Sequence, residues 1–119
     1  MYAVRGAITV EHNDAGEILA ATERLVGELM ARNGLTPAEL ISCIFTVTDD
    51  LDAAFPAQAA RRVGLSRVPL LCAREIPVPG SLPRVIRILA HCDGPNGQDA
   101  HHVYLEEARR LRADLDAAQ

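Results

Sequence analysis

The stretch RVIRILAHC, residues 84–92, predicts a β-strand with two unlike faces. The run is otherwise apolar, and in a strand one face would carry Ile86, Ile88, Ala90 and Cys92 and the other Val85, Arg87, Leu89 and His91. The guanidinium of Arg87 cannot lose its charge, so burying it without an anionic partner is very costly. This strand therefore predicts a permanent cation that needs an anion.

A second arginine stands in the same setting near the N-terminus, where residues 2–11 read YAVRGAITVE. Arg5 lies on the small and polar face of this predicted strand, and the other face is apolar: Tyr2, Val4, Ile8 and Val10. Two strand arginines in one small chain indicate a cationic site for an anion.

Working outward, the spacing predicts a helix from Asp14, with Glu17 as in a capping box, to Asn33-Gly34. Further predicted elements are a helical turn at 36–39, strands at 40–48 and 68–73, a short helix at 56–63 ended by Gly64, and a loop at 76–83. From His101 onward the sequence fits either strand or helix.

The order β-α-β-α-β-β predicts an α+β domain, a mixed sheet of four or five strands with helices packed on one face. The polar faces around Arg5 and Arg87 need a partner that covers them, and the simplest such partner is another copy of the chain.

Composition restricts the function. The 119 residues predict one domain, 1–119, with 49% hydrophobic residues. A net charge of −4 and the absence of Trp argue against nucleic-acid and membrane partners. All 12 basic residues are Arg, which excludes a lysine Schiff base, pyridoxal-phosphate attachment and a P-loop lysine.

Three cysteines, Cys43, Cys72 and Cys92, are odd in number and widely spaced, which predicts reduced thiols in a cytoplasmic protein. We expect no leader and no membrane-spanning segment. The adjacent His101 and His102 would diverge in a strand or a helix, so we expect no metal.

Several short motifs occur in a fixed order: VRGAITVE (4–11), FTVT (45–48) with Asp50-Leu51, AFPA (54–57) with AAR (59–61), VPLLC (68–72) with Glu75, IRI (86–88) and HVYL (102–105) running to Leu111-Arg112. In this order and at these intervals the chain resembles the monofunctional chorismate mutases of the trimeric α/β-barrel type, which are distinct from the all-helical class.

The resemblance implies that the chain is an isomerase that rearranges chorismate to prephenate on the route to Phe and Tyr. It also implies a homotrimer that forms a pseudo-α/β-barrel, with sites in the clefts between subunits and no cofactor. The matching catalytic positions are Arg87, Glu75, Arg5 and Cys72, and the substrate-binding positions are Tyr104, Phe55, Ala57, Arg61, Leu70, Leu71, Leu111 and Arg112. Leu71 stands where the family has a Thr, and Gln58 where it has a Lys.

The reaction that the resemblance implies suits these residue types. A unimolecular pericyclic shift needs the reactive conformer and a counter-charge at the breaking ether oxygen, and it needs no nucleophile, base or cofactor. We therefore expect Arg87 to donate to the ether oxygen, Arg5 and Tyr104 to hold the side-chain carboxylate, and Glu75 to accept from the ring hydroxyl or to pair with an arginine in the empty site.

Cys72 would help to place the same hydroxyl, through its side chain or its backbone. Glu75 lies three residues further on, so a bulge or bend must intervene if both side chains serve one site. We expect residues 106–119 to form a mobile tail that carries Arg112. Two other functions stay open: an enamine/imine deaminase on a similar trimeric fold, and a non-catalytic trimer that binds a small anion and regulates a partner.

Overall fold

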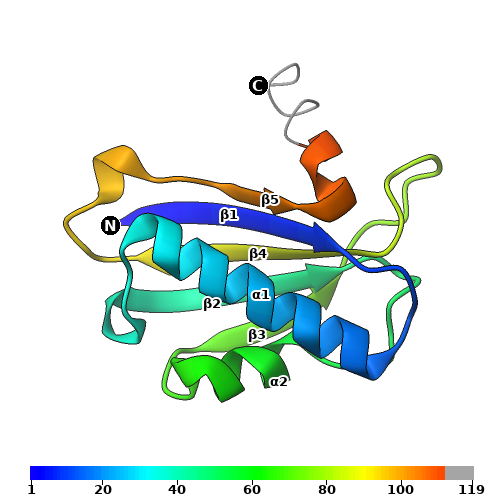
Figure 1. Cartoon of the computed structure of the whole chain (residues 1–119), viewed down its shortest axis with the longest axis horizontal. Coiled ribbons are helices and arrows are strands. Elements are labelled where there is room, and N and C mark those ends of the chain that lie inside the picture. The colour runs from blue at the N-terminus through cyan, green and yellow to red at the C-terminus, as the bar shows by residue number, and fades with distance from the viewer. Residues whose placement is uncertain (112–119) are drawn as a thin grey trace.

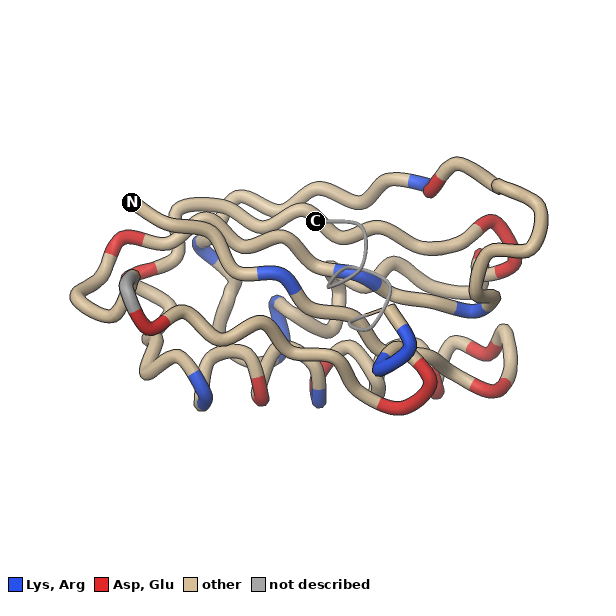
Figure 2. Tube along the Cα trace, turned by 90° about the horizontal axis from the view of Figure 1, so that it is seen from above, with Lys and Arg blue, Asp and Glu red and all other residues tan. Residues whose placement is uncertain are grey.

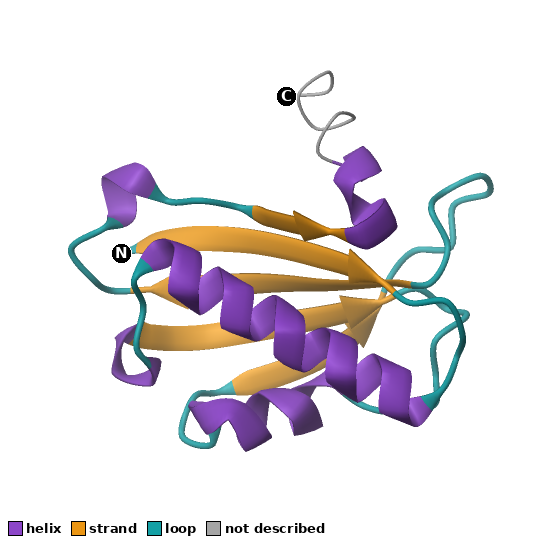
Figure 3. Ribbon diagram, in the orientation of Figure 1, coloured by secondary structure: helices purple, strands orange, loops and turns teal. Residues whose placement is uncertain are grey.

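Five strands form a single mixed sheet, and the helices α1 and α2 cover one of its faces (Figures 1 and 3). The computed structural model describes residues 1–111, except the side chain of Gln98. In chain order the elements, with η for short 3₁₀ or π turns, are β1 (Tyr2–Thr9), α1 (Ala15–Asn33), η1 (Pro37–Glu39), β2 (Leu40–Val47), α2 (Pro56–Ala60), η2 (Arg61–Leu65), β3 (Leu70–Arg74), β4 (Val85–Cys92), η3 (Gly97–Asp99), β5 (Val103–Leu105) and η4 (Glu106–Ala108).

The strand order across the sheet is β3-β2-β4-β1-β5. The central strand β4 pairs antiparallel with both β1 and β2, and the outer strands β5 and β3 pair parallel with β1 and β2. The predicted α+β class, the mixed sheet and the placement of the helices on one face are confirmed. The fifth strand, β5, settles the region that the sequence left ambiguous.

The core lies between the sheet and α1. Its largest fully buried side chains come from the helix-facing side of the strands and from one stripe of the helix: Val4, Ile8, Phe45 and Ile86 from strands, and Ile18, Leu25, Val26 and Leu29 from α1. The helix begins where the Asp14 carboxylate accepts a hydrogen bond from the backbone N–H of Glu17. It ends at Gly34, whose φ of 59° lies in the left-handed region that glycine adopts readily because it has no side chain. Basic and acidic positions both occur along α1 (Figure 2), and Arg32 forms an exposed ion pair with Glu28.

The predicted element bounds shift by a few residues. The fourth strand begins at Val85 because Arg84 adopts a left-handed conformation, with φ of 53°. The carboxylate of Asp50 accepts the Arg84 backbone N–H at 3.0 Å, and the Arg84 Nε donates to the carbonyl of Val10 at 3.2 Å. These bonds, which join three distant segments, support a backbone conformation that is uncommon for a residue other than glycine.

The segment after β5 turns back onto the fold. Glu106 pairs with Arg24 on α1, the backbone N–H of Glu107 donates to the Thr9 hydroxyl at 3.0 Å, and Ala108 is fully buried. Residues 112–119 of the predicted mobile tail, including Arg112, lie outside the described residues. Among residues 1–111, no helix combines the length and the apolar character needed to cross a membrane.

Candidate active site

The face of the sheet opposite the helices carries a row of side chains that crosses four neighbouring strands. Arg87 on β4 lies opposite Thr46 on β2 and opposite Ala7 on β1, and Ala7 in turn lies opposite Tyr104 on β5. Because paired residues of neighbouring strands point to the same face, these side chains share one surface, which we call the open face. Arg5 lies on it diagonally from Arg87, since Arg5 pairs with Leu89.

Glu75 supplies the anion that Arg87 needs. The Arg87 Nε lies 3.2 Å from the Glu75 Oε1, without the alignment of a directed hydrogen bond, so the contact is an ion pair. The exposed fractions of the two side chains are 43% and 18%, so the arginine still presents much of its surface to the open face. Both residues line a cleft of about 430 Å³ between the strand ends and the 76–83 loop. Glu75 is thus paired with an arginine of the predicted site.

Arg5 is held through its backbone by the segment that leads into β5. The Arg5 N–H donates to the Nδ1 of His102 at 3.0 Å, so that nitrogen carries no proton. Burial, together with the positive charge of Arg5, lowers the pKa of His102. The imidazole therefore stays neutral to lower pH than usual, and the connection between β1 and β5 is kept.

Tyr104 and Leu111 come together at one end of the open face. They pack against a small buried cluster that consists of Ala7, Val85 and Ala108. The helical turn after β5 therefore brings Leu111 back to the cluster on which Tyr104 packs, and Ala7 of this cluster lies opposite Arg87.

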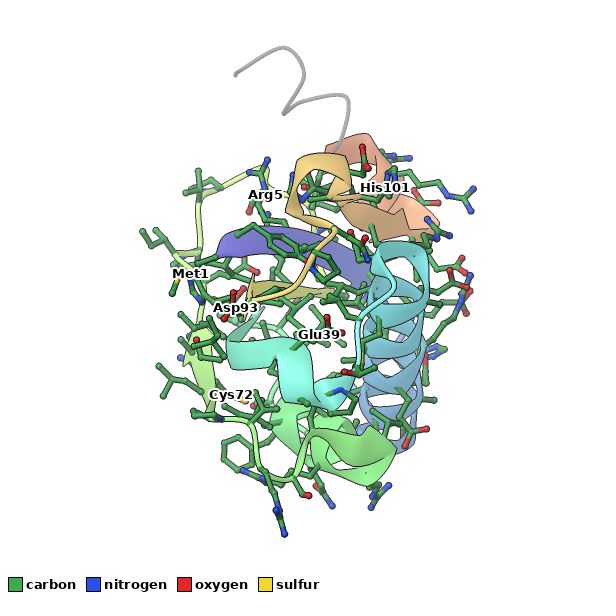
Figure 4. The ribbon with its side chains drawn as sticks, turned by 90° about the vertical axis from the view of Figure 1, so that its left-hand side faces the viewer. Met1, Arg5, Glu39, Cys72, Asp93 and His101 are labelled. Atoms are coloured by element: carbon green, nitrogen blue, oxygen red, sulfur yellow. The ribbon has the colours of Figure 1, made fainter. Side chains whose placement is uncertain are left out.

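Cys72 lies on the other face. It pairs with Phe45, a fully buried residue of the helix-facing core, and Figure 4 shows Cys72 and Arg5 toward opposite edges of the sheet. Pairing between β2 and β3 is regular through Arg74, and the Glu75 N–H then donates to the Val47 carbonyl at 2.9 Å. The bulge or bend that would be needed to bring both side chains to one site of the same chain is absent from this segment, so Cys72 and Glu75 point to opposite faces, as the period of a strand requires.

Most of the remaining predicted residues lie on the side of Cys72. Phe55, 72% exposed at the start of α2, lines a cleft of about 550 Å³ together with Cys72 and Gln58. Ala57 is buried and Leu70 packs on the core, whereas Arg61 is exposed at the end of α2. Leu71, 61% exposed, is the member of this stretch that points to the open face, since it pairs with Ile44.

The predicted residues thus form two groups within one chain. The open-face group comprises Arg5, Leu71, Glu75, Arg87, Tyr104 and Leu111, and the α2-side group comprises Phe55, Ala57, Arg61, Leu70 and Cys72. Glu75 and Arg87 of the first group line one cleft, and Phe55 and Cys72 of the second group line another. No set of three or more His, Cys, Asp or Glu within residues 1–111 is arranged to hold a metal ion.

Sequence reasoning assigned no role to Thr46, whose hydroxyl donates to the Glu75 Oε2 at 2.9 Å. Alternation along the strand 40–48 carried the necessary signal, because Thr46 is a polar residue on the same face as Ser42 and Thr48. What the sequence did not reveal was that this face also carries Arg87.

The family model described as "Chorismate mutase type I" matches residues 1–115. The chain belongs to the type I chorismate mutases.

Relatives agree with this assignment over nearly the whole chain. The chain is 56% identical to the chorismate mutase AroH of Thermus thermophilus over 118 residues, which cover 98% of this chain and 97% of that protein. It is 38% identical to the chorismate mutase AroH of Bacillus subtilis over 115 residues, which cover 94% and 90%. The solved structure of a chorismate mutase from Clostridium thermocellum superposes with a TM-score of 0.90 at 49% identity, covering 93% of this chain and 100% of that one.

Membership of the type I chorismate mutases confirms the family that the ordered motifs indicated, and it makes the chain an isomerase. The fold match is with this class and not with the all-helical one, in agreement with the five-stranded sheet.

Proposed function

We propose that the protein rearranges chorismate to prephenate in sites formed between the subunits of a homotrimer. Membership of the type I chorismate mutases supports this reaction, which is a step of aromatic amino acid biosynthesis. The observation that carries the intersubunit site is the separation of the candidate residues onto two faces of one chain.

The open face offers the charges that the reaction needs. Chorismate is a dianion, and Arg87 and Arg5 are diagonal neighbours on one surface. Arginine binds a carboxylate with two parallel hydrogen bonds and keeps its charge. In this proposal Arg87 donates to the ether oxygen, where negative charge develops in the transition state, and Arg5 with Tyr104 holds the side-chain carboxylate. Glu75 accepts from the ring hydroxyl.

A second subunit would supply the other half of the site. If the α2 side of one copy packs against the open face of its neighbour, Phe55 and Arg61 come to face Arg87 across the interface. Apolar walls from Phe55, Leu70 and Leu111 would then exclude water and strengthen the electrostatic interactions. Exposed apolar side chains at and beyond β3, namely Leu71, Ile76 and Val78, fit a surface that such a contact would cover.

We propose that three copies close into a pseudo-α/β-barrel, because each subunit would then cover the open face of its neighbour and no open face would be left exposed. Cys72 sits on the edge strand β3, so its backbone, as well as its side chain, is available to a ligand held at that edge. In this proposal Arg112, which matches a family position near the mouth of the cleft, helps to capture the dianionic substrate. We also propose a cytoplasmic location, which the three free thiols support.

Two measurements test this proposal. Disappearance of chorismate, followed spectrophotometrically with prephenate identified as the product, tests the reaction, and sedimentation of the same sample tests the trimer. We expect an active trimer. A fully active monomer would rule out the intersubunit site while leaving the reaction intact. A trimer without mutase activity would favour the anion-binding regulator, and turnover of an enamine instead of chorismate would favour the deaminase.

A further inference from the structure

We propose that Thr46 is a positioning residue that orients the Glu75 carboxylate for substrate binding. The inference rests on the proposed function, because it concerns the residue expected to accept from the ring hydroxyl of chorismate. It begins from the geometry of Glu75, whose two oxygens have different partners. Oε1 lies 3.2 Å from the Arg87 Nε, and Oε2 accepts from the Thr46 hydroxyl at 2.9 Å.

The backbone fixes the positions of the three residues relative to one another. Thr46 and Arg87 are direct partners in the antiparallel pairing of β2 and β4. Glu75 follows β3, and its N–H bond to the Val47 carbonyl extends the parallel pairing of β2 and β3 by one residue. The Glu75 side chain therefore passes over β2 to reach Arg87 on β4, and Thr46 is the β2 residue that lies between them.

The hydroxyl must be the donor in this contact, because an ionised carboxylate offers acceptors only. A hydrogen bond to a charged group is stronger than one between neutral groups. Thr46 is also β-branched, so its χ1 is restricted and its hydroxyl has a defined direction. One fixed donor on Oε2 sets the rotation of the carboxylate and leaves Oε1 next to Arg87 and able to accept a hydrogen bond from a ligand in the cleft.

This arrangement has a consequence for substrate binding. Without the Thr46 hydroxyl, the Glu75 carboxylate is free to turn and to bind Arg87 more closely, in competition with the anionic substrate. The ring hydroxyl takes no part in bond breaking, so a misplaced Glu75 weakens substrate and transition state about equally. Such a loss raises KM and leaves kcat nearly unchanged. A defect in Arg87 itself would lower kcat instead.

The experiment compares steady-state kinetics of the full-length protein with those of Thr46→Val, which keeps the shape and removes the hydroxyl. We expect KM to rise about tenfold and kcat to stay within about threefold, the size expected for one charge-assisted hydrogen bond. Thr46→Ser restores the donor and should recover most of the wild-type KM. Thr22→Val is the matched control: Thr22 is a fully buried threonine on α1 whose hydroxyl donates to the Ile18 carbonyl, and its replacement should leave KM unchanged.

A double variant separates positioning from a general structural effect. In Glu75→Ala, the Thr46 hydroxyl has no carboxylate to orient, so adding Thr46→Val should raise KM no further. Additive effects in the double variant, a KM unchanged in Thr46→Val, or a failure of Thr46→Ser to recover KM would each overturn the inference while the wild type remains active. An inactive wild-type protein would overturn the proposed function and this inference together.

Discussion

The backbone N–H of Arg5 on β1 donates to the Nδ1 of His102, the residue that immediately precedes β5. The bond requires a neutral imidazole, since a protonated Nδ1 is a donor and cannot accept. A pH-dependent hydrogen bond thus connects the edge strand β5 to β1, the strand that carries the candidate catalytic residue Arg5.

Stability should fall at mildly acidic pH because of His102. Burial and the charge of Arg5 lower its pKa in the folded chain, so the unfolded chain binds this proton first as the pH falls. The contribution is fully present above about pH 6.5, the ordinary value for histidine, and is lost as the pH falls through the lowered folded-state pKa. Urea-unfolding midpoints measured from neutral to acidic pH should drop less steeply in His102→Asn, whose amide oxygen can accept at any pH. His101→Asn is the control, because the structure uses the His101 backbone to bond Asn33. Identical slopes in all three proteins would show that His102 is not responsible.

Arg87→Ala should lower kcat far more than it raises KM, since the proposed bond to the ether oxygen strengthens in the transition state. We expect a loss on the order of 10³-fold, and Arg87→Lys should fail nearly as badly because a point charge cannot reproduce the guanidinium fork. Arg32→Ala, which removes an exposed pair with Glu28 on α1, is the control and should keep full activity. The assignment fails if either Arg87 variant keeps more than about a tenth of the wild-type kcat.

Cys72→Ala and Cys72→Ser should keep kcat/KM within about tenfold of wild type, because the mechanism uses no covalent intermediate. EDTA should leave the mutase activity unchanged. Alkylation should inhibit only by filling space at Cys72, since Cys43 and Cys92 are fully buried and burial raises the pKa of Cys43 to about 11. Abolished turnover in a folded Cys72→Ala trimer would contradict this view and indicate covalent catalysis.

Asn33→Ala should destabilise the fold by about 2 kcal/mol, the typical cost of leaving buried polar groups without partners. The Asn33 side chain is nearly fully buried, donates to the Leu29 and His101 carbonyls, and accepts the His101 N–H at 2.7 Å. Asn13 makes a comparable set of bonds to Asp52 and Ala53 but is exposed, so Asn13→Ala should cost about 1 kcal/mol or less. Urea unfolding at one fixed protein concentration measures both, and equal losses would contradict the argument from burial.

Alternation along single strands predicted the placement of Arg87 and Arg5 correctly, because a strand repeats every two residues whatever surrounds it. The same rule indicated that Cys72 and Glu75 point apart unless a bulge intervenes, and the regular pairing of β3 keeps them apart. The left-handed conformation of Arg84 and the contact of Thr46 with Glu75 lay beyond sequence reasoning. Both depend on segments that are distant in sequence, and no local pattern of residues encodes that pairing.

The strand order also determines the order in which the strands can pair while the chain is being synthesised. β4 lies between β1 and β2, and Tyr2 at the start of the chain pairs with Cys92 at the end of β4. While a ribosome is still making the first part of the chain, α1 can form locally and β2 can pair with β3, but β1 has no neighbour to join. Such non-local pairing is slow and leaves apolar strand edges open to other chains. The nascent protein is therefore most prone to aggregate just before β4 leaves the ribosome.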